Sequence, residues 1–370
     1  MPAAPLTILQ LTFQGDGAGS TQSIFSLSDH LRRRGHRVLL GVRNESLLAE
    51  MGRSAGLPVV PLDFTRLGPL ARRLADVIAS EKIEVINSHA TRDRRALTWL
   101  RWQGRLRAGF VVTRRTMPRT SPLELFAIGH TADRTIAVSD GVARALARRL
   151  HPTGKLRVVP NGIDLARIDA PLPAAELDAA RRTIGDTAGR PVVVIVARRK
   201  DQDVAIRALA NVTHPVVLVC AGVEPDPGLA QAAATVPERH AVRFAPFTPG
   251  ALAYYHLAKI AALPSRIEGL SQSLLEAMAL GLPVIASRAG GNPDLVTEDC
   301  GLLVPPRDPA AWATAFERLL ADDGLASRFA AAGRSRVRAH FTLERTAERT
   351  ETVYREAVAA RSLQAGAGRH

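Results

Sequence analysis

Two glutamates flank the predicted start of a helix, Glu268 in the loop before it and Glu276 inside it. Between them lies the stretch Gly269-Leu270-Ser271-Gln272-Ser273, in which Ser271 is the expected N-cap of a helix running to Leu280. The backbone N–H groups at a helix start form an anion site suited to a diphosphate. We expect the two carboxylates to accept hydrogen bonds from sugar hydroxyls beside it. For either glutamate alone, a capping acid or a solvated helix-face acid is the open alternative.

A leaving diphosphate also requires cations, and Arg198, Arg199 and Lys200 directly follow a predicted strand over 192–196. Arginine offers bidentate contacts to phosphate and lysine a point charge. Any of the three can supply this positive charge. The plain alternative is a basic surface turn.

Further polar residues follow two predicted strands in the first half of the chain. His89 comes after a strand at 85–86, and Arg114 and Arg115 come after a strand at 110–112. Carboxyl ends of parallel strands are where such sheets bind ligands, so these residues are expected on the side of a second substrate. The arginines favour an anionic one. A lone histidine is equally well explained as a structural residue.

Short β-branched runs alternate with helical patterns through the whole chain, which predicts parallel sheets built from βαβ units. The turn Pro160-Asn161-Gly162 interrupts the alternation, which then restarts. We therefore expect an α/β protein of two doubly wound, Rossmann-like domains that face each other across a cleft. The expected domains are 1–165 and 166–345, with a C-terminal helix over 346–370 that packs back on the first.

The chain has 370 residues with 49 Lys+Arg against 35 Asp+Glu, a net charge of +14. Residues 1–165 alone hold 25 basic and 13 acidic residues. This asymmetry favours an anionic partner, although high arginine usage by itself is the alternative. Two cysteines exclude a disulfide framework, and no stretch has the pattern of a signal peptide or a membrane span. The expected location is the cytoplasm.

The segment 92–107 joins six arginines to an apolar set. That set is Leu97, Trp99, Leu100, Trp102 and Leu106. As a helix it is suited to the surface of an anionic membrane such as the inner face of the cytoplasmic membrane. The alternative is a helix that packs its apolar side on the sheet. No nucleic-acid-binding module accompanies it, so no nucleic acid is expected.

Taken together, these segments resemble the retaining glycosyltransferases of family 4, which have the GT-B fold. The spacing from Glu268 to Glu276 resembles that family's pair of glutamates with seven residues between them. Four further segments match the family's motifs in order: 34–38 (RGHRV), 159–164 (VPNGID), 290–296 (GGNPDLV) and 301–306 (GLLVPP). The resemblance extends over about residues 6 to 355.

The resemblance implies roles for individual residues. Glu276 would bind the donor ribose and Glu268 the transferred sugar, with the backbone of 269–273 on sugar hydroxyls and diphosphate. The family's glycine pair falls on Ala18-Gly19, which puts Gly19 on the phosphate side. The family's histidine after the next strand is replaced by Arg115, a departure from the pattern. The family's Arg and Lys after the first strand of its second domain fall on Arg198 and Lys200, with Arg199 as an alternative to either. The catalytic set would be Glu268, Arg198, Lys200 and His89.

The expected function is transfer of a hexose, with retention and without a metal or cofactor, from a nucleotide-diphosphate sugar to a hydroxyl. No acidic pair of the DxD type is found where metal-dependent enzymes of this kind place one. The expected acceptor is an envelope glycan or a lipid-linked or phosphorylated molecule, as in lipopolysaccharide or polysaccharide assembly. Two alternatives remain: a nucleotide-sugar epimerase of the same fold, and a non-catalytic basic protein that binds membranes or nucleic acid.

Overall fold

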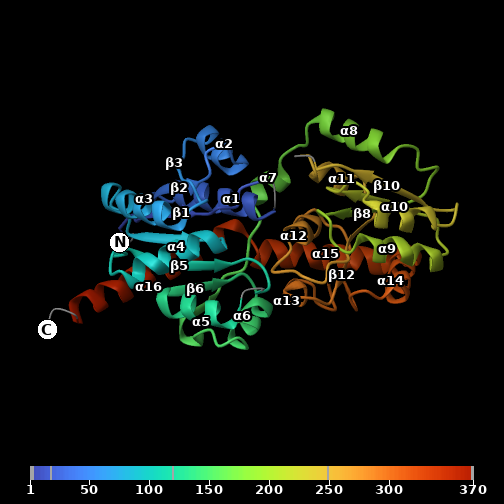
Figure 1. Cartoon of the computed structure of the whole chain (residues 1–370). Coiled ribbons are helices and arrows are strands. Elements are labelled where there is room, and N and C mark those ends of the chain that lie inside the picture. Colours follow the sequence, from blue (N-terminus) through green and yellow to red (C-terminus); the bar gives the residue numbers. More distant parts are fainter. Residues whose placement is uncertain (1–3, 17–18, 119–120, 248–249, 368–370) are drawn as a thin grey trace. The chain divides into compact units, whose positions relative to one another are not determined.

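The computed structural model describes residues 4–16, 19–118, 121–247 and 250–367, and the chain divides into two compact units (Figure 1). Unit 1 comprises Met1–Gly162 together with Leu343–His370, and unit 2 comprises Ile163–Thr342. Each division lies three residues before the boundary expected from the sequence. The last helix, α16 (Leu343–Ala367), is therefore part of unit 1.

Unit 1 is built on a sheet of seven strands in the order β3-β2-β1-β4-β5-β6-β7, all of them parallel. The strands are brief and mostly buried on both faces, as in a sheet covered by helices on either side. They are β1 (Thr7–Leu11), β2 (Arg37–Val42), β3 (Val59–Pro61), β4 (Val85–Ser88), β5 (Gly109–Arg114), β6 (Arg134–Ala137) and β7 (Leu156–Val158).

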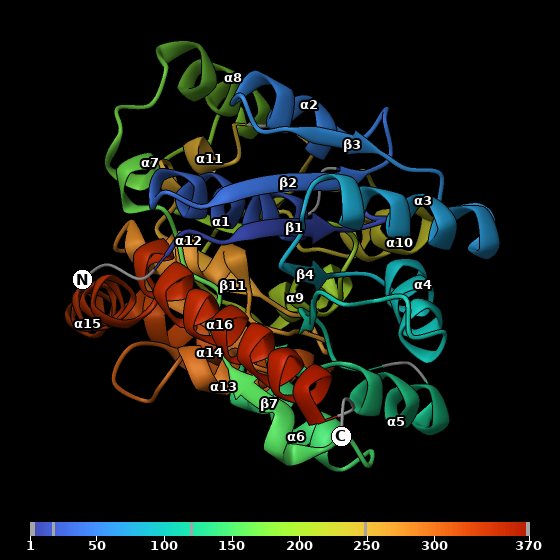
Figure 2. The same cartoon turned by 90° about the vertical axis from the view of Figure 1, so that its left-hand side faces the viewer.

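Helices cover both faces of this sheet. They are α1 (Gly19–Arg33), α2 (Leu47–Ser54), α3 (Leu67–Ser80), α4 (Thr91–Trp102), α5 (Pro122–Thr131), α6 (Asp140–Ala147), α16 and a 3-10 turn at Thr153–Lys155. One core joins α3, α4 and α5 to the sheet, and a second joins α1, α2 and α16 to it. Figure 2 shows α16, which packs on α1 and β5 and buries Tyr354 and Ala357 completely.

Unit 2 has a parallel sheet of six strands in the order β10-β9-β8-β11-β12-β13. The strands are β8 (Val192–Val196), β9 (Val217–Ala221), β10 (Ala241–Ala245), β11 (Ile260–Leu263), β12 (Val284–Ser287) and β13 (Leu302–Val304). The helices are α7 (Leu165–Asp169), α8 (Ala174–Ile184), α9 (Gln202–Ala208) with a 3-10 turn at Leu209–Asn211, α10 (Pro227–Ala234), α11 (Leu252–His256), α12 (Gln272–Ala279), α13 (Asn292–Leu295), α14 (Pro309–Ala321) and α15 (Asp323–His340).

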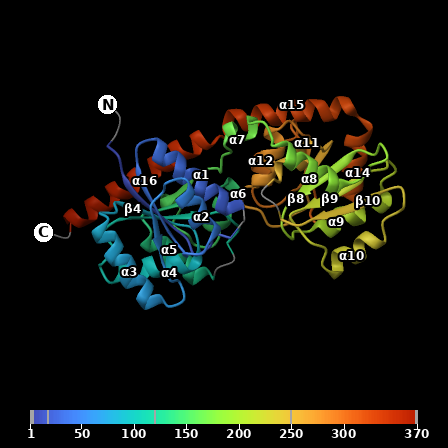
Figure 3. The same cartoon turned by 90° about the horizontal axis from the view of Figure 1, so that it is seen from above.

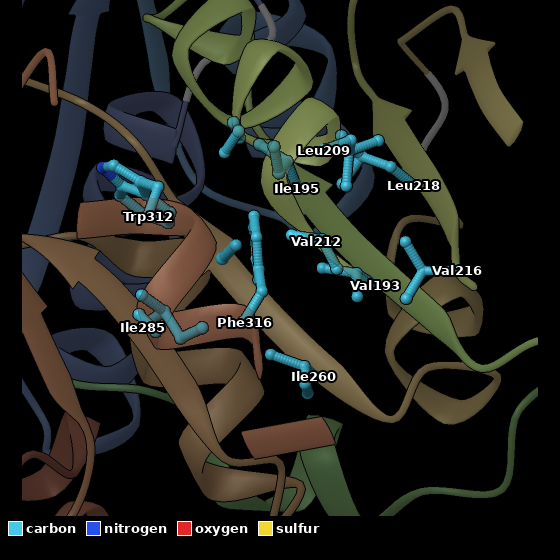
Figure 4. Close-up of a cluster of buried hydrophobic side chains, with 14 of the residues drawn as sticks. Val193, Ile195, Leu209, Val212, Val216, Leu218, Ile260, Ile285, Trp312 and Phe316 are labelled. Carbon is cyan, nitrogen blue, oxygen red and sulfur yellow. The ribbon is translucent and has the colours of Figure 1, made fainter. Parts of the chain in front are cut away.

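The core of unit 2 includes Trp312, the largest fully buried side chain among the described residues. Trp312 and Phe316 of α14 lie against aliphatic residues of the sheet such as Ile195 and Ile285 (Figure 4). Burial of apolar surface contributes about 25 cal/mol per Å², so these contacts stabilise the sheet strongly. They fix the strands from which the loops discussed below emerge.

Both sheets reverse their strand order at an inner pair of strands. In unit 1 the pair is β1 and β4, and in unit 2 it is β8 and β11. At such a switch point the loops after the two strands leave in opposite directions and open a ligand site at the carboxyl edge. The loops after β8 and β11 carry Lys200 and Glu268, while the segments after β1 and β4 carry Gly19 and His89.

The sequence expectation of two doubly wound parallel-sheet domains is confirmed. One expectation was wrong in part: the segment 92–107 does not form one helix with a single apolar face. The helix α4 ends at Trp102, and Leu97, Leu100 and Leu106 are buried in the core while Trp99 and Trp102 are exposed. The apolar residues therefore divide between two faces, because packing on the sheet takes only those on the inner side of the helix.

Two loops at the carboxyl edge of unit 2 touch through their backbones. Gly290 has φ +57°, and a Cβ placed on it would lie 1.9 Å from the carbonyl oxygen of Glu268. Only glycine fits here, because both the left-handed conformation and the missing side chain are required. The backbone of Gly290 thus packs directly against the backbone of the loop that carries Glu268.

We predict that Gly290→Ala destabilises unit 2 more than Gly281→Ala does. Gly281 also has a positive φ, +81°, but a Cβ there would meet its nearest atom, Arg334 Cδ, at an ordinary 3.7 Å. Gly281→Ala, the control, should therefore lower the free energy of unfolding by about 1–2 kcal/mol through the backbone conformation alone. Gly290→Ala should lower it by about 1–3 kcal/mol more, because the added methyl group overpacks the contact. Urea denaturation of the two variants measures the difference, and equal losses would contradict the close approach.

Candidate functional site

Lys200 and Glu268 meet at the switch point of unit 2. The Lys200 Nζ donates to Glu268 Oε1 at 2.6 Å, and the side chain of Glu268 is only 11% exposed. A charge-assisted contact of this length is among the stronger polar interactions of a protein. Asp201 links the same two loops, since its Oδ2 accepts from the backbone N–H of Arg266 at 3.0 Å. The loops after β8 and β11 are therefore joined by two polar bridges.

The other two basic residues of the β8 loop have different environments. Arg199 is held by carboxylates, with its Nε donating to Asp226 at 2.6 Å and its Nη1 to Asp203 at 3.1 Å. Both carboxylates hold Arg199 in place, which favours Arg198 and Lys200 as the residues that bind a ligand. The guanidinium of Arg198 is exposed and lies 5.9 Å from the centroid of the Phe247 ring.

Glu276 lies within α12 and is buried, with 8% of its surface exposed. Its Oε1 accepts a hydrogen bond from Arg167 Nη1 of α7 at 3.0 Å. Burial raises the pKa of Glu276 because a carboxylate loses solvation there, while Arg167 acts in the opposite direction. The alternative of a solvated helix-face acid is excluded for this residue.

The start of α12 is formed as the sequence predicts. Ser271 is the N-cap, and its hydroxyl accepts from the N–H of Leu274 at 3.3 Å. Gly269 and Leu270 are buried in the turn before it, and Gln272 and Ser273 form the first turn. The N–H dipoles of this turn give the helix start a partial positive charge near Glu268 in the chain.

In unit 1, the loop after β1 leads into α1, which begins at the exposed Gly19. The neighbouring Gly17 and Ala18, including the position aligned with the family's first glycine, lie outside the described residues. Gly15 packs on α2, because a Cβ there would lie 3.0 Å from Ser46 Cβ. The described part of the loop therefore places Gly19 at the N-terminus of a helix.

His89 lies at the switch point of unit 1 inside a buried polar network. Its Nε2 is 2.8 Å from Gln10 Oε1, and Gln10 Nε2 donates to Tyr354 Oη at 2.9 Å. With the amide of Gln10 in this orientation, Nε2 of His89 carries the proton and Nδ1 is an acceptor. The Nδ1 atom is buried and has no hydrogen-bond partner among the described residues.

His89 is also kept neutral. Burial lowers the pKa of His89 well below its usual value, with smaller contributions from Arg115 and Arg94. Its imidazole is therefore a hydrogen-bond acceptor rather than a cation at neutral pH.

Arg94, Arg114 and Arg115 bring three largely buried guanidinium groups to the same edge of the sheet. Burial lowers the pKa of Arg114 to about 9 and that of Arg115 to about 10. Arg115 Nη1 donates to Asn161 Oδ1 at 2.6 Å, and Arg94 Nη2 donates to Thr91 Oγ1 at 2.9 Å.

Two carboxylates act on these three arginines, Asp93 on Arg94 and Glu124 on both Arg94 and Arg114. Oδ2 of the buried Asp93 accepts from Ser88 Oγ at 2.7 Å and from two backbone N–H groups at the start of α4. The carboxylate of Glu124 is paired with Arg95. Positive charge thus exceeds negative charge at this edge.

Sequence reasoning missed Arg167, Tyr354 and Arg94. Arg167 is 109 residues from Glu276, and Tyr354 is 344 residues from Gln10, so no local pattern connects them. Arg94 counted only as one of six arginines in its segment. A signal for it was present, since it lies in the first turn of α4 directly after the His89 loop.

A shallow pocket at the amino ends of β8 and β11, lined by residues such as Arg190, His256 and Lys259, lies at the opposite edge of unit 2. No group of three or more His, Cys, Asp or Glu that suits a metal gathers among the residues described. In the same part of the chain, every helix is too short or too polar to cross a membrane.

Two family models match the chain, one in each half. The model described as Glycosyltransferase Family 4 matches residues 17–167, and the model described as Glycosyl transferases group 1 matches residues 190–322. The second match contains Arg198, Lys200, Glu268 and Glu276, and the first contains Gly19, His89, Arg114 and Arg115.

Curated relatives share about a third of their aligned residues with the chain. A D-inositol 3-phosphate glycosyltransferase of Salinispora arenicola is 36% identical over 255 residues, which are 62% of this chain and 56% of the relative. A GDP-mannose-dependent alpha-(1-6)-phosphatidylinositol monomannoside mannosyltransferase of Mycolicibacterium smegmatis is 34% identical over 225 residues, 56% of this chain and 58% of the relative. The chain thus spans about half the length of the curated relatives it matches.

Solved structures match over nearly the whole chain. HepE of Anabaena in complex with UDP-glucose superposes with a TM-score of 0.80 at 20% identity, covering 94% of this chain and 99% of that one. This likeness shows the fold, which is GT-B. The two family models match residues 17–167 and 190–322 in turn, and the chain therefore belongs to the family 4 glycosyltransferases.

Proposed function

We propose that this protein transfers a hexose, with retention of anomeric configuration, from a nucleoside-diphosphate sugar to a hydroxyl of an anionic acceptor. The observation that carries the donor side is the contact between Lys200 and Glu268 at the switch point of unit 2. A relative named as a glycosyltransferase, a second named as a GDP-mannose-dependent mannosyltransferase and a structural neighbour bound to UDP-glucose support it.

In this proposal, Lys200 and Glu268 exchange partners when the donor binds. The ammonium group of Lys200, with Arg198 and the start of α12, stabilises charge that develops on the leaving diphosphate. Glu268 then accepts hydrogen bonds from hexose hydroxyls, Glu276 does so from the ribose, and Gly19 approaches the phosphates through its backbone. These cations and dipoles supply the positive charge without a metal or cofactor.

The chemical step breaks the bond from the anomeric carbon to the phosphate oxygen and forms a bond to the acceptor oxygen on the same face. The acceptor's proton passes to the departing phosphate. His89 Nδ1 is an acceptor that orients the attacking hydroxyl. Because its pKa is held low, His89 positions that hydroxyl and does not itself take the proton.

We predict that Lys200→Met lowers kcat/KM for sugar transfer by about 10²–10³, the usual loss when one group that stabilises developing charge is removed. The control is Lys259→Met, because Lys259 forms a surface pair with Asp323 at 2.7 Å. This control should leave transfer unchanged. Transfer assays with UDP-glucose and GDP-mannose measure both variants. Unchanged transfer in Lys200→Met would contradict the role.

The same assays discriminate between the proposed transferase and its alternatives. A transferase consumes donor rapidly only when acceptor is added. An epimerase consumes donor without acceptor and forms an isomeric nucleotide sugar. A non-catalytic protein leaves the donor unchanged under both conditions.

The buried arginines of unit 1 carry the acceptor proposal. Removing a guanidinium group from water is costly unless negative charge or hydrogen bonds compensate for the lost solvation, so an anionic group is a suitable ligand for Arg94 and Arg115. Nε of Arg94 and Nε of Arg115 are buried and have no hydrogen-bond partner among the described residues. The curated relatives carry names with inositol 3-phosphate and phosphatidylinositol, both phosphates. We therefore propose a phosphorylated or lipid-linked acceptor, which includes envelope glycan precursors that carry a phosphate.

We predict that Arg94→Gln weakens the preference for a phosphorylated acceptor. Wild-type protein should use inositol 3-phosphate better than inositol, and Arg94→Gln should lower this ratio by about tenfold or more, since a hydrogen bond to a charged group contributes about 1.5–3 kcal/mol. Arg115 still favours the phosphate in this variant, and the exposed Arg72→Gln on α3 should behave as wild type. The kcat/KM ratio of the two acceptors measures this. A ratio unchanged by Arg94→Gln would contradict the acceptor site.

An exposed apolar surface on α4 and α5 favours contact with an anionic membrane. Trp102 is 69% exposed, Leu123 is 83% exposed and Phe126 is 47% exposed. The helices α3, α4 and α5 are neighbours on one side of unit 1 (Figure 3), and exposed arginines lie on α4 and directly after it. These are Arg92, Arg95, Arg105 and Arg107. Such a surface suits the interface of a membrane that also holds a lipid-linked acceptor.

We predict that the protein sediments with vesicles containing phosphatidylglycerol and not with pure phosphatidylcholine. Each arginine near an anionic surface contributes about 1 kcal/mol, so salt should weaken the binding. Trp102→Ser with Leu123→Ser should release it, whereas Leu150→Ser, at a residue 71% exposed on another part of unit 1, should not. If the protein does not bind anionic vesicles, the proposal that this surface contacts a membrane is wrong.

A further inference from the structure

The ion pair between Arg167 and Glu276 connects two helices of unit 2. Arg167 lies on α7, whose N-cap is Asp164, and its Nη1 reaches Glu276 Oε1 at 3.0 Å. The side chain of Glu276 is 11% exposed and that of Arg167 is 35% exposed. Within this pair, the side chain of Arg167 is partly exposed to solvent and the side chain of Glu276 is largely buried.

The short helix α7 is anchored to the rest of unit 2 independently of this pair. Arg338 of α15 donates to Asp169 at the end of α7. Ile168, which precedes Asp169 in the same helix, is buried. At the start of α7, the N–H of Ile163 donates to the carbonyl of Phe341 at 2.9 Å. Because both ends are fixed, the guanidinium of Arg167 is presented to Glu276 from a constant position.

Other groups around Glu276 do not replace Arg167. Tyr255 of α11 is buried nearby, but its hydroxyl donates to the carbonyl of Ser273 at 2.9 Å. From α15, which also packs on α12, Arg334 reaches Gly281 just after the far end of that helix. Among the described residues, Arg167 is the cation that acts on the buried carboxyl, and Oε2 of Glu276 accepts no hydrogen bond from them.

We propose that Arg167 is a positioning residue for the donor: it holds Glu276 as an oriented carboxylate, with Oε1 occupied and Oε2 directed to the ribose hydroxyls. This inference rests on the donor site of the proposed function. A carboxylate accepts strong, charge-assisted hydrogen bonds from hydroxyls, whereas a protonated carboxyl group offers a weaker acceptor and one donor.

The consequence is a change in pH dependence when Arg167 is removed. Burial raises the pKa of Glu276, and Arg167 opposes that rise. Without Arg167 the pKa moves further up, so the carboxylate is present only at higher pH. Binding of a ribose should then be weak at low pH and recover as the pH increases through the new pKa.

The experiment compares wild type with Arg167→Met by calorimetric titration of UDP and GDP from pH 6 to pH 9 or so. We expect wild-type affinity to change little and that of Arg167→Met to fall about tenfold or more at the acidic end, a factor that corresponds to one pKa unit. Arg167→Lys should restore much of the acidic-end affinity. In a Glu276→Gln background, Arg167→Met should add no pH dependence, since the titrating group is gone.

The matched control is Arg338→Met, which removes the anchor of α7 at Asp169 but leaves the charge beside Glu276. Arg338→Met should change the affinity for UDP and GDP by the same factor at every pH. Should Arg167→Met fold poorly, ¹³C NMR of labelled glutamate at low temperature reads the Glu276 titration directly, and a pKa no higher than in wild type overturns the inference.

Two binding results separate this inference from the proposed function. Wild-type protein that binds neither nucleotide overturns the donor site and the inference with it. Wild-type protein that binds, with Arg167→Met showing the same affinity at every pH, overturns only the role of Arg167.

Discussion

Lys200 and Glu268 are 68 residues apart in the chain, and their side chains meet because β8 and β11 are adjacent strands of unit 2. In a parallel sheet all loops at the carboxyl edge emerge on one side, and the switch point separates two of them. Apolar packing under the sheet fixes those strands, and Gly290 supports the Glu268 loop from behind. The ion pair is therefore a product of topology, and the proposed donor chemistry depends on it.

Charge is arranged differently in the two units. In unit 2, the acids and bases of the candidate site are paired: Lys200 with Glu268, and Arg167 with Glu276. A bound donor would exchange these internal partners for its own hydroxyls and phosphates, so little net charge has to be buried. In unit 1, arginines exceed carboxylates at the carboxyl edge, which favours a ligand that brings negative charge. The excess of basic residues in 1–165 is thus partly inside the fold and partly on the surface, where it includes α4 and the segment directly after it.

Much of the fold follows from local patterns in the sequence. Short β-branched runs indicate the strands, Ser271 caps α12 as expected, and Gly35 adopts the positive φ of a residue that ends a helix. Individual side-chain partners could not be predicted in the same way. The pairing of Arg167 with Glu276, and of Tyr354 with Gln10, depends on segments distant in the chain. The ion pair of Arg199 with Asp226 is a further example, because Asp226 lies in the loop after β9 and is 27 residues away in the chain. Periodicity also cannot tell which apolar residues of 92–107 face the sheet, since both sides of α4 carry them.

The decisive measurement is the structure of the protein with an intact nucleoside-diphosphate hexose bound. We expect Lys200 Nζ to leave Glu268 and to lie about 2.7–2.9 Å from a phosphate oxygen, with Glu268 accepting a hydrogen bond from a hexose hydroxyl. A complex in which the contact of Lys200 with Glu268 is intact and the sugar nucleotide lies elsewhere would contradict it.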